Sequence, residues 1–73
     1  MRLYRIGDEG PAIRDIQSRL RAQGLDLSQD EVSRFGEGTE RAVKQFQSSR
    51  GLAPDGIVGP DTWRALYEAG YKL

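Results

Sequence analysis

Asp55 and Asp61 come closest to a catalytic pair in this sequence. They lie six positions apart in a chain of 73 residues that contains no His and no Cys. Neither carboxyl group lies in an apolar run that would raise its pKa for acid–base catalysis. Structural roles explain these residues better than catalysis does. Asp55 suits an Asx-turn, and Asp61 places a favourable negative charge at a helix start. The sequence therefore predicts no catalytic residue and no enzymatic activity.

Metal and phosphate sites are also disfavoured. Without His or Cys the chain lacks the usual ligands of zinc and cannot form a disulfide. The stretch GEGT, residues 36–39, contains a Gly-x-Gly but lacks the lysine of a phosphate-binding loop. We therefore expect no metal and no cofactor.

The charge distribution limits the class of partner. Eleven basic and eleven acidic side chains are spread along the chain and cancel, so no basic block suggests nucleic-acid binding. No apolar run approaches the length of a membrane span, and residues 1–11 lack the apolar core of a signal peptide. We expect a monomer that binds neither nucleic acid nor membrane.

A few side chains could instead contact a ligand. Trp63, the only tryptophan, could stack on a sugar, but core packing is the favoured interpretation. Gln17 and Gln47 are expected to bond loop backbone rather than a ligand. Three glycines shape the backbone by default, and the same positions would allow a ligand to approach closely. They are Gly36, Gly56 and Gly59.

Three segments with helical periodicity would position these residues. They comprise residues 12–24, 38–51 and 60–70. Asp8 is expected to cap the first helix, and Pro60 fits the first position of the third. The segments end at Gly24, Gly51 and Gly70. We expect an all-α fold, a compact three-helix bundle with short turn or extended connectors.

An internal repeat accompanies these helices. Phe35-Gly36-x-x-Thr39 matches Val58-Gly59-x-x-Thr62 at an offset of 23 residues. We interpret each Gly-x-x-Thr as a helix entrance, in which the glycine permits a tight turn and the threonine hydroxyl returns to N–H groups of the first turn.

The connectors differ in length and composition. In the long first connector, four apolar residues are expected to tuck under the core. These are Leu25, Leu27, Val32 and Phe35. In the short second connector, Asp55-Gly56 after Pro54 predicts a turn, and Ile57-Val58 a brief extended piece.

Together these motifs resemble the three-helix peptidoglycan-binding domain family. The matching stretches are IQSRL (16–20), FGEGTERAVKQFQ (35–47) and DGIVGPDTWRAL (55–66), and the resemblance covers about residues 6–66. It implies a non-catalytic module that holds bacterial or phage cell-wall hydrolases, such as amidases, on murein. One position departs from the family pattern: Ser33-Arg34 replaces an Asp-Gly, so the first loop is expected to lack the family turn.

We therefore predict one domain over residues 1–73, a module of a longer cell-wall enzyme, which binds peptidoglycan through its glycan chain, its stem peptide or both. The predicted ligand-binding residues are Phe35, Gly36, Thr39, Asp55, Gly56, Gly59, Thr62 and Trp63. The alternative is a structural or protein-interaction module that docks on a neighbouring catalytic domain or a partner protein. Attached to its parent, the domain would lie in the cell wall, the periplasm or the extracellular space.

Overall fold

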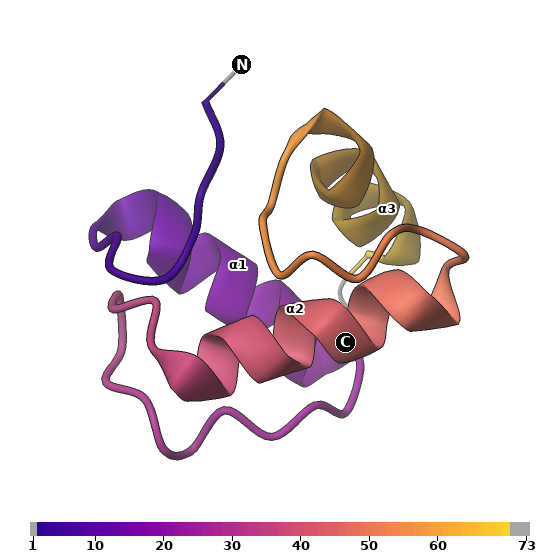
Figure 1. Ribbon diagram of the computed structural model, residues 1–73. Helices are drawn as coiled ribbons and strands as arrows, with labels where there is room; N and C mark the ends of the chain where they lie inside the picture. The colour runs from indigo at the N-terminus through magenta and orange to yellow at the C-terminus, as the bar shows by residue number, and fades with distance from the viewer. Residues whose placement is uncertain (1, 71–73) are drawn as a thin grey trace.

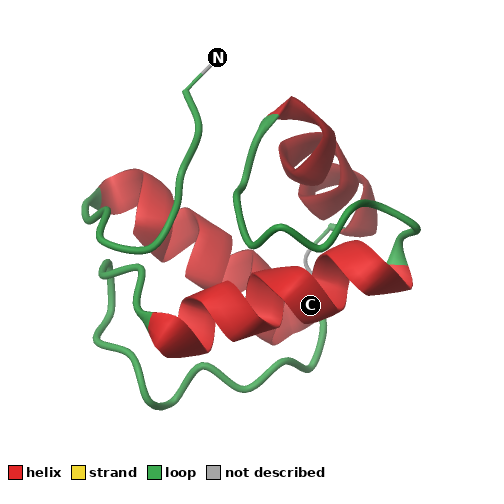
Figure 2. Ribbon diagram, in the orientation of Figure 1, coloured by secondary structure: helices red, strands yellow, loops and turns green. Residues whose placement is uncertain are grey.

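The chain folds into three α-helices joined by two irregular connectors, in a computed structural model that describes residues 2–70. Helix α1 spans Pro11–Ala22, α2 spans Glu37–Ser49 and α3 spans Pro60–Ala69. In Figure 1, α2 passes in front of α1 and α3 lies to one side, and Figure 2 shows no strand among the described residues. The predicted all-α three-helix fold is confirmed.

Prolines and glycines set the ends of the helices. Pro11 and Pro60 each open a helix, where the missing N–H would have had no intrahelical partner. Gly24 and Gly51 follow α1 and α2 with positive φ angles of 85° and 73°. In both places the N–H of the next leucine donates back to a carbonyl of the last turn. Gly70, with φ of 68°, ends α3.

The predicted N-cap of α1 is wrong. Because the helix begins at Pro11, its N-cap is Gly10, and no side chain caps it. Asp8 lies two residues before the N-cap, and its carboxylate accepts the N–H of Arg5 at 3.0 Å.

The core draws on all three helices and both connectors. Its buried apolar side chains are Ile13, Ile16, Leu20, Leu27, Phe35, Ala42, Val43, Phe46, Val58, Trp63 and Leu66. Leu27 and Phe35 are buried as expected, and Leu25 packs against the core from a partly exposed position. The expectation for Val32 is wrong, because its side chain is 57% exposed.

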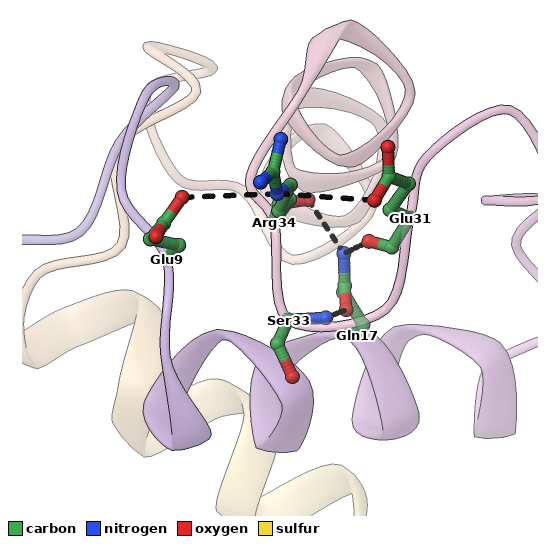
Figure 3. Close-up of polar contacts among 5 residues, drawn as sticks. All are labelled: Glu9, Gln17, Glu31, Ser33 and Arg34. Carbon is green, nitrogen blue, oxygen red and sulfur yellow. Dashed lines mark hydrogen bonds and ion pairs between the residues drawn. The ribbon is translucent and has the colours of Figure 1, made fainter.

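The N-terminal segment ties the two connectors together. Tyr4 pairs with Val58 of the second connector, which confirms a brief extended piece there, and Glu9 pairs with Arg34 of the first. Arg34 also lies between the carboxylates of Glu9 and Glu31, at 3.7 and 3.8 Å (Figure 3). These exposed ion pairs add little stability. Within residues 2–70, no helix has both the length and the apolar character needed to cross a bilayer.

Candidate ligand-binding site

Gln17 on α1 organises the end of the first connector. Its side-chain Nε2 donates to the carbonyls of Glu31 and Arg34 at 3.2 and 2.9 Å, and to the hydroxyl of Thr39 at 3.1 Å. Its Oε1 accepts the N–H of Ser33 at 2.8 Å. Figure 3 shows the amide inserted into the loop. The side chain is fully buried, so these bonds form without competition from water.

Gln47 on α2 repeats this arrangement in the second connector. Its Nε2 donates to the carbonyl of Ile57, the carboxylate of Asp55 and the hydroxyl of Thr62, at 2.9, 2.9 and 3.0 Å. Its Oε1 accepts the N–H of Gly56 at 3.0 Å. The expectation that both glutamines bond loop backbone is confirmed.

The first connector keeps the turn that it was expected to lack. Ser33 adopts a φ of 71°, close to the 77° of Gly56, and each N–H donates to a buried glutamine. Counted back from the Phe-Gly and Val-Gly pairs, Ser33 matches Gly56, so the sequence alignment of this turn was displaced by one residue. Serine tolerates the left-handed conformation at a cost, and the hydrogen bond from its N–H to Gln17 offsets that cost.

Asp30 in the first connector caps α2. Its carboxylate accepts the backbone N–H groups of Gly36, Gly38 and Thr39 at 3.0, 3.1 and 2.6 Å, and the hydroxyl of Thr39 at 2.6 Å. We call these four donors the first cradle. Partial burial alone would raise the pKa of Asp30, but hydrogen bonds from Thr39, Gly38 and Gly36 outweigh it and lower the pKa.

The two threonines act differently from the sequence-based expectation. Within residues 2–70, neither hydroxyl bonds an N–H group of its own first turn. Thr39 accepts from Gln17 and donates to Asp30, whereas Thr62 accepts from Gln47. Each threonine therefore connects a helix start to the buried glutamine of its repeat.

An open cavity of about 240 Å³ lies at the start of α3. Its lining residues are Leu3, Gln47, Leu52, Ala53, Asp55, Ile57, Gly59, Pro60, Asp61 and Thr62. We call it the α3 cavity. It combines an aliphatic wall with the polar groups of a helix start, a composition suited to a small amphipathic ligand group.

Asp55 contributes a charged carboxylate to the α3 cavity. Its Oδ1 accepts the N–H of Ile57 at 2.9 Å, an Asx-turn as predicted, and the side chain of Gln47. The Ile57 and Gln47 hydrogen bonds together hold the pKa of Asp55 below its ordinary value. The carboxylate is therefore ionised at neutral pH, and its other oxygen, Oδ2, is available to accept an N–H or O–H.

Three of the eight predicted ligand-binding residues line the α3 cavity, namely Asp55, Gly59 and Thr62. The other five are Phe35, Gly36, Thr39, Gly56 and Trp63, and none of them lines it. Two are core side chains, because Phe35 is 2% exposed and Trp63 7%. The favoured interpretation of Trp63 is confirmed, since its ring packs on Tyr4 and Tyr67, with centroids 6.0 and 5.6 Å away.

The remaining predicted residues belong to other parts of the fold. Gly36 and Thr39 are in the first cradle, bonded to Asp30. Gly56 is buried, and a Cβ atom there would meet the side chain of Glu40 on α2 at 2.9 Å.

Sequence reasoning missed Asp30 and the aliphatic wall of the α3 cavity. Asp30 lies in a polar connector among other acidic residues, so its type alone gave no signal. The glycines at positions 36 and 38 were the available sign that a group approaches the backbone closely there. In the structure that group is the Asp30 carboxylate, which a Cβ atom at Gly36 would meet at 2.7 Å. Leu3 and Leu52 come from segments far apart in the sequence, which only the fold brings together.

A second cavity, of about 350 Å³, adjoins the first along α3 and shares Leu52 and Asp61 with it. Arg50, Arg64 and Glu68 add charged groups there. The surface beside the α3 start therefore carries both signs of charge.

Comparison with known proteins identifies the family to which the chain belongs. A family model described as "Putative peptidoglycan binding domain" matches residues 9–66. The chain is 40% identical over 78 residues to the N-acetylmuramoyl-L-alanine amidase CwlM of Mycobacterium tuberculosis, an alignment that covers 94% of the chain and 19% of the amidase.

A second curated relative and a solved structure are similar to the chain over most of its length. The chain is 42% identical over 65 residues to the zinc D-Ala-D-Ala carboxypeptidase of Streptomyces albus G, covering 85% of the chain and 25% of the carboxypeptidase. It superposes on the crystal structure of the Burkholderia AP3 phage endolysin with a TM-score of 0.85 and 37% identity, over 97% of the chain and 27% of the endolysin. The chain thus spans about a quarter or less of the curated relatives described here.

Proposed function

Because the chain belongs to the peptidoglycan-binding domain family, we propose that it binds bacterial cell-wall peptidoglycan and holds an attached hydrolase on that substrate. The family match over residues 9–66 is the observation that carries this proposal. It includes the starts of α1, α2 and α3 and both glutamine-centred loops. The names of the amidase and carboxypeptidase relatives support a hydrolase as the parent protein.

The proposed binding surface is the α3 cavity. Asp55 would accept an N–H or O–H of the ligand through Oδ2, while Leu52 and Ile57 contact its apolar groups. Peptidoglycan offers both kinds of group, because it is a sugar chain that bears peptides. The module would act without catalysis, as a monomer, wherever its parent meets the cell wall.

Sedimentation with purified murein sacculi tests the proposal. The folded chain should pellet with sacculi and stay in solution without them. Asp55→Asn should reduce the pelleted fraction while circular dichroism shows an unchanged fold, since the amide is isosteric but uncharged. Arg14→Gln, on the exposed face of α1, is the control and should pellet like the original chain.

Failure of the original chain to pellet with sacculi from several bacterial sources would refute peptidoglycan binding. It would favour the alternative function, docking on a neighbouring catalytic domain or a partner protein.

A further inference from the structure

We infer that the start of α3 is a second carboxylate cradle, built for a carboxylate of the ligand, and that within peptidoglycan it takes a free carboxylate of a stem peptide rather than a sugar. The identification of the stem peptide rests on the proposed function. The carboxylate preference itself rests on the geometry of the chain.

The first cradle supplies the template. At α2, three backbone N–H groups and one threonine hydroxyl all donate to the Asp30 carboxylate, at distances between 2.6 and 3.1 Å. Convergent N–H groups at a helix start, together with the helix dipole, form a strong anion site. The chain thus contains a working carboxylate site within one of its two repeats.

The start of α3 presents the same four donors. At an offset of 23 residues they are the N–H groups of Gly59, Asp61 and Thr62 and the hydroxyl of Thr62, and none of them has an acceptor among residues 2–70. We call them the second cradle. Gly59, Asp61 and Thr62 all line the α3 cavity.

The hydroxyl of Thr62 is the strongest sign of a ligand. Its residue is 5% exposed, and its oxygen already accepts from Gln47 at 3.0 Å. Its proton is therefore a buried donor without a protein acceptor. In the first cradle the matching hydroxyl of Thr39 accepts from Gln17 in the same way and donates its proton to Asp30. A carboxylate of the ligand would complete the second network identically.

Gly59 keeps the second cradle open. Its φ of −107° suits any residue, as does the −104° of Gly36, so the backbone does not require glycine at either position. At Gly36 the missing side chain is what lets the carboxylate approach, because a Cβ atom would lie 2.7 Å from Asp30 Oδ1. At Gly59 a Cβ atom would meet only Leu3 Cδ2, at 3.0 Å, the end of an exposed side chain.

No side chain of the second connector reproduces Asp30. Ala53 precedes Gly56 by three residues, as Asp30 precedes Ser33, and Ala53 lines the α3 cavity with a methyl group. The ligand must therefore supply the carboxylate that the chain supplies at α2.

The surroundings indicate what accompanies the carboxylate. Leu3, Leu52 and Ile57 favour a small aliphatic group beside it, and Asp55 Oδ2 favours a neighbouring N–H. The acidic neighbours Asp55 and Asp61 do not exclude an anion, because the first cradle holds Asp30 beside two first-turn acids, Glu37 and Glu40. The C-terminal residue of a peptide with a small side chain meets all three requirements.

A titration of the ¹⁵N-labelled chain, followed by NMR, tests the inference. The probes are N-acetyl-D-alanyl-D-alanine, its C-terminal amide, and acetate. The dipeptide should shift the amide signals of Gly59, Asp61 and Thr62 and leave those of Gly36 and Thr39 unchanged. It should bind about tenfold more tightly than its amide, the difference expected when a charged acceptor becomes neutral. Equal binding of acid and amide, or shifts elsewhere, would overturn the inference.

Acetate distinguishes a peptide site from a general anion site. Because acetate lacks the aliphatic and N–H contacts, it should bind at least about tenfold more weakly than the dipeptide. Equal affinity for acetate would overturn the peptide assignment and leave only an anion site.

Two matched variants place the effect at the second cradle. Gly59→Ala adds a methyl group where the carboxylate should lie, so it should fold normally and lose dipeptide binding by about tenfold or more. Gly36→Ala adds the same group beside Asp30, so it should lower the melting temperature while the folded protein keeps its dipeptide affinity. Unchanged binding by Gly59→Ala would contradict the inference.

A third variant supplies the carboxylate internally. Ala53→Asp should raise the melting temperature and abolish dipeptide binding, whereas Ala53→Ser should do neither.

Failure of the inference and failure of the proposed function give different results. If the chain pellets with sacculi but binds the dipeptide no more tightly than its amide, the inference fails and the proposed function stands. Murein would then be bound without the second cradle. A chain that binds the dipeptide at Gly59 but does not pellet has a carboxylate cradle that serves another source of peptide carboxylates.

Discussion

Ser33 and Gly56 perform the same task at different energetic cost. Both residues have positive φ, and both donate their N–H to a buried glutamine. Serine carries a Cβ atom that disfavours this conformation, whereas glycine does not. Ser33 is the only non-glycine residue with positive φ among residues 2–70.

Ser33→Gly should stabilise the chain by about 0.5–1 kcal/mol, because relief of backbone strain outweighs the added freedom of the unfolded glycine. Urea denaturation measures the change. A loss of stability would show that the serine side chain contributes more than its backbone conformation costs.

Gly56→Val should destabilise the chain by about 1–3 kcal/mol, because a β-branched residue resists positive φ. A Cβ atom there would also meet Glu40 Cγ at 2.9 Å and Lys44 Cε at 3.1 Å. Gly59→Ala, at negative φ, is the matched control and should change stability little. Equal thermal melts for Gly56→Val and the original chain would contradict this prediction.

At the scale of elements, the helix that follows each connector is capped differently, α2 after the first connector and α3 after the second. Helix α2 begins on a carboxylate from its own connector, and α3 begins without a side-chain cap. The capping bonds of α2 reach back six to nine residues, so they lock the first connector and the helix together. The second connector is held instead by Gln47 and by pairing with the N-terminal segment.

Asp30→Ala should cost about 2–3 kcal/mol of stability, because it leaves charge-assisted hydrogen-bond donors without an acceptor. Asp26→Ala is the control, since Asp26 is exposed and bonds only the nearby Ser28. A loss at Asp30 no larger than that at Asp26 would show that water replaces the cap at little cost.

Acid should weaken the fold through Asp30 and Asp55, whose pKa values are both lowered from 3.8. A lowered folded-state pKa gives stability that is complete above the unfolded pKa. That stability is lost as the pH falls through about 4 toward the folded-state value, because the unfolded chain takes up protons first. Denaturation curves between pH 7 and pH 2 should show this decline, and Asp30→Asn should flatten it. A decline that begins at pH 6 would indicate other groups.

The helices could be predicted from the sequence, whereas the first cradle could not. Proline, glycine and apolar spacing act within one or two turns, so Pro60 and Gly51 marked helix ends correctly. The role of Asp30 depends on a connector without periodicity that folds back on α2. Of the predicted ligand-binding residues, Asp55, Gly59 and Thr62 line the α3 cavity, whereas Trp63 is buried in the core, as its favoured interpretation predicted. Local signals define elements, and contacts between elements define the cavity.

At the scale of the whole molecule, the α3 cavity is small and open on a domain of 8.2 kDa, so the proposed binding should be weak. The amidase and carboxypeptidase relatives are about four to five times longer than the segment that matches this chain. Weak binding suits such a module, because attachment to a larger protein makes each further contact intramolecular.

The isolated chain should bind soluble peptidoglycan fragments with a dissociation constant of about 1 µM to 1 mM, which corresponds to about −8 to −4 kcal/mol. Isothermal titration calorimetry measures it. A tandem fusion of two copies should bind sacculi with a far lower apparent dissociation constant than one copy. Nanomolar binding by the single chain would show a more extensive contact surface than the α3 cavity.

The connectors also set the valency of the domain. The first connector runs from residue 23 to residue 36 and the second from residue 50 to residue 59, a difference of four residues. The first connector folds the Asp30 carboxylate onto α2, whereas the second has Ala53 at the equivalent position, so one chain presents one open cradle. Grafting the second connector in place of the first would open the other cradle and give a bivalent module at the expense of the α2 cap. The residue at one loop position, Asp30 in the first connector and Ala53 in the second, thus determines whether this small fold offers a polymer one open cradle or two.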